Sequence, residues 1–213
     1  MIRNEEEARA WISRLAQCDA LALDRLEALV GLLREENQRQ NLVSRASLDS
    51  VWQRHVADSA QLLNHVPRET SGPWFDLGTG AGFPGLVIAI LCPAMTVRLA
   101  ESRPRRTDWL ERARSVLDLD HAEVAAQRVE DMPASKVAVI SARAFAPLDT
   151  LLDLSARFST TDTQWLLPKG ASAQHELDAL GGWNHAFAVE PSLTDPKAGI
   201  IVGTLAGRKA RTT

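Results

Sequence analysis

Four glycines follow an aspartate within ten residues of this sequence, in the segment DLGTGAGFPG that starts at Asp76. Glycine permits positive φ angles and lets backbone N–H groups approach a ligand closely. The apolar residues 74–77 predict a strand that leads into the segment, and Pro84 is suited to begin a helix after it. A strand, a glycine-rich turn and a helix in this order indicate a nucleotide-binding loop.

Two kinds of nucleotide fit the glycine spacing. Gly80, Gly82 and Gly85 match GxGxxG, the fingerprint of dinucleotide-binding folds. Gly78, Gly80 and Gly82 also match GxGxG after an acid, which is typical of S-adenosylmethionine (SAM) methyltransferases. A carboxylate at Asp76 repels a pyrophosphate but attracts the ammonium group of a methionine moiety. The loop therefore favours SAM over NAD, and a packing turn that binds no nucleotide is the third alternative.

Further acids end the next two predicted strands. Glu101 ends a strand over residues 95–101, where a carboxylate can accept the ribose hydroxyls of SAM or of NAD. Glu130 and Asp131 follow the strand over 122–127, where a methyltransferase usually binds the adenine amine. Ligands of open α/β sheets bind at the carboxyl ends of the strands. These acids are therefore expected to line one pocket with the glycine loop.

The sequence around this loop predicts that the chain has two parts. Residues 1–66 show helical patterns, with Asn4, either Asp19 or Asp24, and Ser47 as the expected N-caps.

After a linker, short apolar strands alternate with helices, which indicates a mostly parallel α/β sheet. The segments 185–190 and 200–206 have no helix between them and predict a closing antiparallel hairpin. We expect a Rossmann-like domain over 67–213 and a helical extension over 1–66.

Composition excludes several classes of protein. The 213 residues are 45% hydrophobic and 24% charged, which is ordinary for a globular chain and unlike a disordered one. Cys18 and Cys92 are far apart and outside any CxxC motif, so we expect no disulfide and no metal site. No apolar run approaches the ~18 residues of a membrane span, and no signal peptide begins the chain. We therefore expect a soluble cytoplasmic protein.

The charge is unevenly distributed. A net charge of −3 argues against a general polyanion binder. Residues 98–114, however, hold six arginines against three acids, and residues 197–213 hold four basic residues and no acid. Two basic islands suit a site-specific nucleic-acid contact, and a solvated helix face with a loose tail is the alternative.

The absence of certain motifs narrows the range of possible methyl acceptors. The chain has no [DN]PP[YFW] loop for an exocyclic amine, and neither cysteine is placed as a nucleophile for cytosine C5. An acceptor that is nucleophilic when neutral, such as guanine N7, remains. It needs no general base, so the enzyme mainly supplies alignment.

Taken in order, seven motifs resemble the ribosomal small-subunit RNA methyltransferase G family, also called glucose-inhibited division protein B. They are NLVS from Asn41, RHVADS from Arg54, DLGTGAGFPG from Asp76, ESRPRR from Glu101, RVED from Arg128, ARAFAP from Ala142 and PKG from Pro168. The resemblance covers about residues 37–172. It implies a Rossmann-like SAM domain with a helical extension, and methylation of guanine N7 in the 530 loop of 16S rRNA.

The resemblance also implies residue roles. The cofactor residues carry over as Asp76, Gly78, Gly80, Phe83, Glu101, Val129, Glu130 and Arg143. We expect Arg143 and Lys169 to face the cofactor, the target guanine or a phosphate. An ion pair of Arg143 with Glu101 or Glu130, and a solvated Lys169, are the alternatives. The expected RNA contacts are Arg54, His55, Arg103, Arg105 and Arg106.

Other interpretations stay open. Arg54, His55 and Asp58 share one helical face and could dock the extension or cover the pocket. The expected partner is 16S rRNA or the small ribosomal subunit, and the expected state is a monomer. A methyltransferase of another acceptor, a non-catalytic SAM-binding ribosome factor and an NAD-dependent reductase are the rivals.

Overall fold

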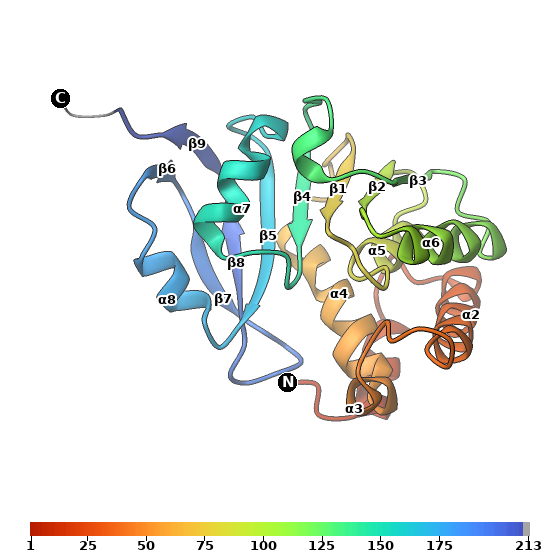
Figure 1. Cartoon of the computed structure of the whole chain (residues 1–213). Coiled ribbons are helices and arrows are strands. Elements are labelled where there is room, and N and C mark those ends of the chain that lie inside the picture. Colours follow the sequence, from red (N-terminus) through yellow and green to blue (C-terminus); the bar gives the residue numbers. More distant parts are fainter. Residues whose placement is uncertain (211–213) are drawn as a thin grey trace.

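A mixed sheet forms the centre of this computed structural model, which describes residues 1–210. Its strands are β1 (Trp74–Leu77), β2 (Val97–Ala100), β3 (Ala122–Ala125), β4 (Val139–Ala142), β5 (Gln164–Gly170), β7 (Ala188–Pro191) and β8 (Gly199–Gly203). The order is β3-β2-β1-β4-β5-β8-β7 (Figure 1). The first five strands are parallel, whereas β8 runs antiparallel to β5 and to β7. The predicted parallel sheet with a closing antiparallel hairpin is confirmed.

Helices surround the sheet, and a second small sheet pairs β6 (Trp183–His185) with β9 (Leu205–Arg208). The amino-terminal helices are α1 (Glu5–Ile12), α2 (Ala20–Glu36), α3 (Arg45–Asp49), a π-helical turn (Trp52–Ala57), α4 (Asp58–Ala60) and a 3-10 turn (Gln61–His65). The remaining ones are α5 (Gly85–Leu91), α6 (Pro104–Val116), α7 (Leu148–Ser155), α8 (Ala173–Asp178) and the 3-10 turns Val129–Asp131 and Ala156–Phe158. No helix within residues 1–210 is long and apolar enough to cross a membrane.

The helix starts follow the predicted caps, with one exception. The side chain of Asn4 accepts a hydrogen bond from the Glu7 N–H, and Asp19 caps α2 in the same way. The cap expected at Ser47 is wrong. Ser44 caps α3 instead, because its hydroxyl accepts the backbone N–H of Ser47 itself.

The predicted third helix is divided into α3, the π-helical turn, α4 and a 3-10 turn, and a distant side chain contacts the π-helical turn. The carboxylate of Glu5 accepts the backbone N–H groups of Trp52 (3.0 Å) and Gln53 (2.8 Å). The Arg9 guanidinium lies 4.5 Å from the Trp52 ring centroid. Helix α1 therefore fixes the turn, and π-helical turns occur frequently at functional sites.

Both faces of the sheet are covered. On one face, Trp74 and Leu99 pack with α2, α5, α6 and the turn that carries Trp52 (Figure 1). On the other face, Phe75 and Leu77 pack with α7. The amino-terminal helices thus share one hydrophobic core with the sheet. The division between residues 66 and 67 stays a prediction about folding units.

Gly85, at the start of α5, has no room for a side chain. A Cβ there would lie 2.1 Å from Leu99 Cδ2 and 2.8 Å from Asp76 Oδ2. We expect Gly85→Ala to lower the free energy of unfolding by about 1–3 kcal/mol, because the core must shift to accept the methyl group. Urea denaturation measures this loss.

Gly31 supplies the matched control. It is an exposed glycine within α2, and a Cβ there would meet no atom within 4 Å. Gly31→Ala is expected to raise the free energy of unfolding by up to about 1 kcal/mol, since alanine favours helix. Equal stability of the Gly85→Ala variant and the wild type would contradict the packing argument.

Candidate functional site

Three loops leave the sheet at the same level. Leu77 of β1 lies in register with Ala100 of β2 and with Ala142 of β4. The loops that begin after these residues therefore start side by side at the carboxyl edge of the sheet. The chain order reverses between β1 and β4, and open α/β sheets bind their ligands at such a point.

A cavity of about 280 Å³ lies among these loops. It is lined by Gly78, Ala100, Glu101, Ser102, Arg103, Arg106, Gln127, Arg128, Val129, Glu130, Ala144 and Phe145. The structure thus brings together four of the predicted cofactor residues, namely Gly78, Glu101, Val129 and Glu130. We call this space the smaller cavity.

Gly78 forms the floor of the smaller cavity with its backbone. Its φ is +63°, which favours glycine, and a Cβ there would lie 2.4 Å from Phe145 Cδ2. Gly80 also has a positive φ but does not line the smaller cavity, and a Cβ there would be 3.4 Å from Arg106 Nη1. Gly78 therefore lines the cavity with backbone only, and the Phe145 ring packs against it.

Asp76 lies beneath the glycine loop rather than against the cavity. Its carboxylate is fully buried and accepts the Gly85 N–H (2.9 Å) and the Ser141 hydroxyl (2.7 Å). Burial raises the pKa of Asp76 to about 6, against the hydrogen bonds from Ser141 and Gly85. From the sequence, we expect this carboxylate to face the ligand. In the structure it ties the loop to the start of α5.

Glu101 is a built acceptor in the cavity wall. Only 7% of the residue is exposed, and its Oε1 accepts the N–H groups of Ser102 (2.8 Å) and Arg103 (2.9 Å). Its Oε2 lies 3.6 Å from Arg106 Nη1. These contacts hold the carboxylate in one orientation, and its remaining lone pairs can accept ligand hydroxyls.

Two further predicted cofactor residues, Glu130 and Phe83, differ in their positions. Glu130 lies at the rim, and a hydrogen bond from Arg128 (2.8 Å) lowers the pKa of its carboxyl. Phe83 is buried, and its ring stacks on that of His55 with the centroids 4.9 Å apart. Phe83 therefore supports the neighbouring helix and does not line the smaller cavity.

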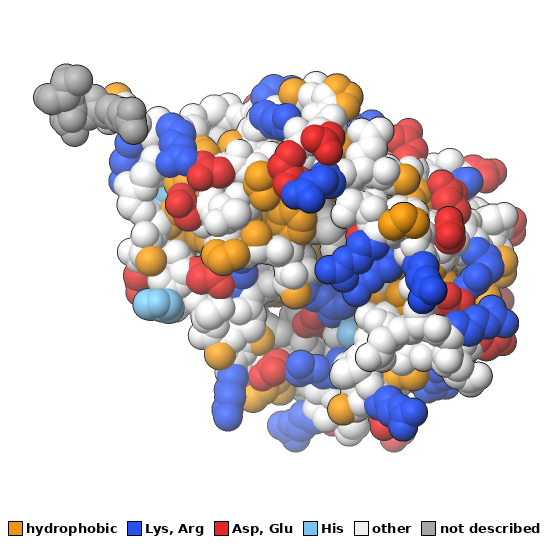
Figure 2. All heavy atoms as spheres, in the orientation of Figure 1, with side chains coloured by type: hydrophobic (Ala, Val, Ile, Leu, Met, Phe, Trp, Pro, Cys, Tyr) orange, Lys and Arg blue, Asp and Glu red, His pale blue; other side chains and the backbone are white. Residues whose placement is uncertain are grey.

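A larger cavity of about 570 Å³ adjoins the smaller one. It lies between the π-helical turn and the loops after β4 and β5, and Figure 2 shows a hollow at the centre of this face (Figure 2). Its polar lining includes Arg54, His55, Asp58, Arg143, Lys169, Glu176 and Asp195. Both cavities share Ala144 and Phe145, which therefore form the boundary between them.

Arg143 joins the end of β4 to the π-helical turn. Its guanidinium donates to the Arg54 carbonyl (3.1 Å) and lies 3.1 Å from His55 Nδ1. It also lies 3.4 Å from Asp58 Oδ2, so its ion pair is formed with Asp58 and not with Glu101 or Glu130. Burial, together with the charges of Arg143 and Arg54, lowers the pKa of His55 to about 3. His55 is therefore neutral and forms part of the contact between Arg143 and the π-helical turn.

Lys169 is neither solvated nor free. Its ammonium donates to the Ala146 carbonyl (2.6 Å) and lies 2.9 Å from Glu176 Oε2. Glu176 also accepts the Leu148 N–H (2.8 Å). The structure therefore places Lys169 as an anchor of the loop after β4, while its expected contact with substrate stays a prediction.

The model of one protein family matches residues 22–190, which is more than half of the chain. That family is described as GidB, rRNA small subunit methyltransferase G. The chain belongs to this family.

Curated members of the family align along almost the whole sequence. The rRNA small subunit methyltransferase G of Novosphingobium aromaticivorans is 59% identical, over 96% of this chain and 90% of its own length. The Erythrobacter litoralis protein of the same name is 55% identical, over 95% of this chain and 97% of its own length. The sequence resemblance is thereby confirmed.

Solved structures show the same fold. A mutant of MtNAS in complex with SAM superposes with a TM-score of 0.56 at 16% identity, over 95% of this chain and 84% of that chain. A Methanococcus jannaschii fibrillarin pre-rRNA processing protein gives a TM-score of 0.54 at 16% identity, over 67% of this chain and 70% of that chain. The Rossmann-like methyltransferase fold that we predicted is confirmed.

The predicted RNA contacts of this family member differ in their exposure and in their ion pairs. Arg103 and Arg105 are exposed at the start of α6 and form no ion pair within residues 1–210. Figure 2 shows basic side chains gathered beside the central hollow. In contrast, Arg106 turns to Glu101 and His55 is buried. Arg54 is half exposed and pairs with Asp195 at 3.0 Å.

The basic carboxyl-terminal segment is only partly described. Arg208 forms an ion pair with Asp153, and Arg211 lies outside the described residues. Among residues 1–210, no group of three or more His, Cys, Asp or Glu side chains could hold a metal ion. Lys197 and Lys209 are exposed and form no ion pair within residues 1–210, so they remain candidates for phosphate contact together with Arg103 and Arg105.

Sequence reasoning missed the residues that brace the site. Glu176 holds both Lys169 and the start of α7, and Asp195 holds Arg54. Leu148 and Glu176 are 28 residues apart in the sequence, and Arg54 and Asp195 are 141 residues apart. No local pattern could have identified such pairs.

Proposed function

We propose that this chain transfers a methyl group from SAM to N7 of a guanine in the 530 loop of 16S rRNA. One observation carries the proposal: a cavity lined by four of the predicted cofactor residues and a larger polar cavity meet at Ala144 and Phe145. A methyl donor and an acceptor base need adjoining sites, because transfer between them is direct. Membership of the family supports RNA as the acceptor.

The smaller cavity fits SAM. Gly78 lines the cavity with backbone alone, and the oriented carboxylate of Glu101 suits the ribose hydroxyls. Val129 and Glu130 are placed for the adenine. Asp76, Gly80, Phe83 and Arg143 would act by shaping the walls. SAM supplies the methyl group as an electrophile.

The guanine N7 lone pair forms the new N–CH₃ bond as the S–CH₃ bond breaks and the sulfur keeps the bonding electrons. No proton leaves the base, so no general base is required. The site suits a reaction without a general base, because its possible bases already have partners. His55 Nδ1 contacts Arg143, and Lys169 pairs with Glu176. Burial raises the pKa of Cys92 to about 11, which disfavours a covalent thiolate route.

The RNA contact follows from the same geometry. Arg103 lines the smaller cavity, and both Arg103 and Arg105 are exposed at the start of α6, where they suit phosphates. A looped, single-stranded target can present its base to the larger cavity. We further propose that the chain acts as a monomer, in the cytoplasm, on 16S rRNA or on the small subunit.

The test uses SAM with a labelled methyl group. Purified protein is mixed with small-subunit RNA, and separately with small-subunit particles, from cells that lack this gene. The RNA is then digested and its nucleosides are separated. Label in 7-methylguanosine, mapped to the 530 loop, is the expected result. Label in another nucleoside would refute the N7 acceptor, and binding without any transfer would favour a non-catalytic factor.

A further inference from the structure

Phe145 differs from the other large aromatic residues of the chain. The sequence has five phenylalanines, six tryptophans and no tyrosine. Among these, only Trp11 and Phe145 are not buried. Trp11 lies on α1, whereas Phe145 lies on the loop that follows β4. Phe145 packs against the core on the α7 face of the sheet but stays partly exposed at the carboxyl edge, where a ligand can contact it.

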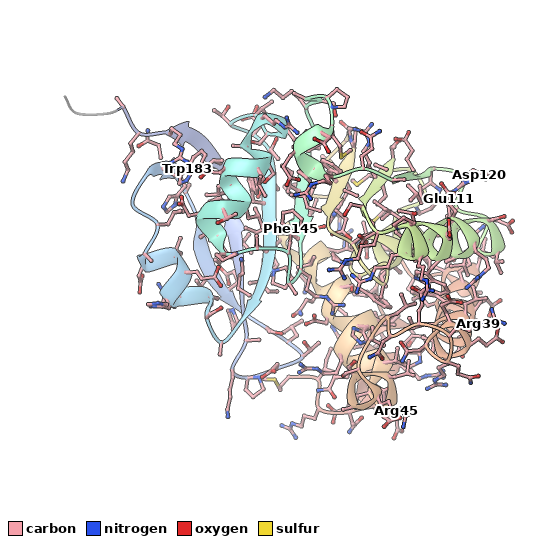
Figure 3. The ribbon with its side chains drawn as sticks, in the orientation of Figure 1. Arg39, Arg45, Glu111, Asp120, Phe145 and Trp183 are labelled. Carbon is pink, nitrogen blue, oxygen red and sulfur yellow. The ribbon has the colours of Figure 1, made fainter. Side chains whose placement is uncertain are left out.

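The ring lies at the boundary of the two cavities. Figure 3 shows Phe145 at the end of β4, near the centre of the molecule (Figure 3). Phe145 lines the smaller and the larger cavity, and it lies so close to Gly78 that a Cβ there would be 2.4 Å from its ring. Because Phe145 lines both cavities, groups bound in the two cavities can each contact it.

The backbone on both sides of the ring is fixed. Before it, Arg143 is held by three contacts with the π-helical turn and α4. After it, the Ala146 carbonyl accepts the Lys169 ammonium. Between them, Ala144 has a φ of +52°, which is uncommon for a residue with a side chain. Such a conformation persists where the surroundings enforce it, and it is found preferentially at functional sites.

We propose that Phe145 is the platform on which the acceptor purine stacks, in the larger cavity and beside the cofactor. This proposal rests on the proposed function and deepens it. Stacking on an aromatic ring is a general mode of binding an unpaired RNA base. A guanine that gains a methyl group at N7 becomes cationic, and the face of an aromatic ring attracts a cation. The ring is therefore suited to bind the base and to favour its methylated form.

Two variants of Phe145 separate the ring from its volume. Phe145→Leu removes the ring but keeps an apolar side chain, while Phe145→Tyr keeps the ring. Methyl transfer to small-subunit RNA gives kcat and KM, calorimetry gives the affinity for S-adenosylhomocysteine, and thermal melting reports folding. Trp11→Leu is the matched control, because Trp11 is the other large aromatic residue that is not buried and it lines neither cavity.

We expect Phe145→Leu to lower kcat/KM for RNA roughly 5- to 150-fold, the range of base–aromatic stacking. Its affinity for S-adenosylhomocysteine should stay within about threefold, and Phe145→Tyr and Trp11→Leu should resemble the wild type. An unchanged kcat/KM in Phe145→Leu would overturn the proposal, as would a tyrosine variant that is as poor as the leucine variant.

Two further outcomes also count against it. An equal fall in the affinity for S-adenosylhomocysteine would show that Phe145 is a wall of the cofactor site. A wild-type protein that methylates no RNA would overturn the proposed function and the stacking role together. If the wild type methylates RNA and only the Phe145 comparison fails, the proposed function stands and this inference falls.

Discussion

Replacing Arg143 by alanine is expected to slow methyl transfer at least about a hundredfold, which corresponds to about 2.7 kcal/mol. The guanidinium links β4 to the Arg54 carbonyl, His55 Nδ1 and Asp58. Without it, the buried His55 ring loses its partner, and an unsatisfied buried polar group costs about 1–3 kcal/mol. The helix that walls the larger cavity is then free to shift. Single-turnover transfer at saturating SAM measures the effect.

Two variants show whether the role of Arg143 is specific. Arg143→Lys keeps the positive charge, but one ammonium group does not reproduce the guanidinium fork, so an intermediate rate is expected. Arg114→Ala removes a comparably buried, ion-paired arginine on α6, remote from the cavities, and should leave transfer unchanged. If Arg143→Ala lowers the melting temperature while the folded fraction transfers methyl at the wild-type rate, Arg143 is a structural residue only.

The sequence predicts the parts of this molecule that local patterns determine. The glycine loop from Asp76, the caps at Asn4 and Asp19, and Pro84 directly before α5 all lie where short-range chemistry requires them. The register of the parallel strands then places the loop and Glu101 at one edge of the sheet. The position of the smaller cavity follows from these elements, whereas the inward orientation of Asp76 does not.

The acceptor side depends on contacts that no local pattern encodes. Glu5 holds a π-helical turn 47 residues away, and Asp58 meets Arg143 across 85 residues. Asp76 also turned inward, because a helix start and a serine on the neighbouring strand both needed an acceptor. The sequence shows that a carboxylate such as that of Asp76 lies near the end of a strand. Packing decides which neighbouring groups the carboxylate binds.

The glycine loop gives the second large effect. We expect Gly78→Val to weaken binding of S-adenosylhomocysteine at least about a hundredfold, or about 2.7 kcal/mol. The φ of +63° disfavours a β-branched residue, and the new Cβ would start 2.4 Å from the Phe145 ring. The added carbons must therefore enter the smaller cavity or displace the loop after β4. Calorimetry measures the affinity, and Gly78→Ala should give a smaller loss because it adds one carbon.

Strain and obstruction can be separated with a second glycine. Gly207, on β9, also has a positive φ (+122°), but a Cβ there would meet no atom within 4 Å. Gly207→Val should therefore lower the melting temperature while the affinity for S-adenosylhomocysteine stays at the wild-type value. A folded Gly78→Val protein with wild-type affinity would show that the cofactor does not lie on this loop. The assignment of the smaller cavity would then fail, because Gly78 is the point where it meets the backbone of the loop.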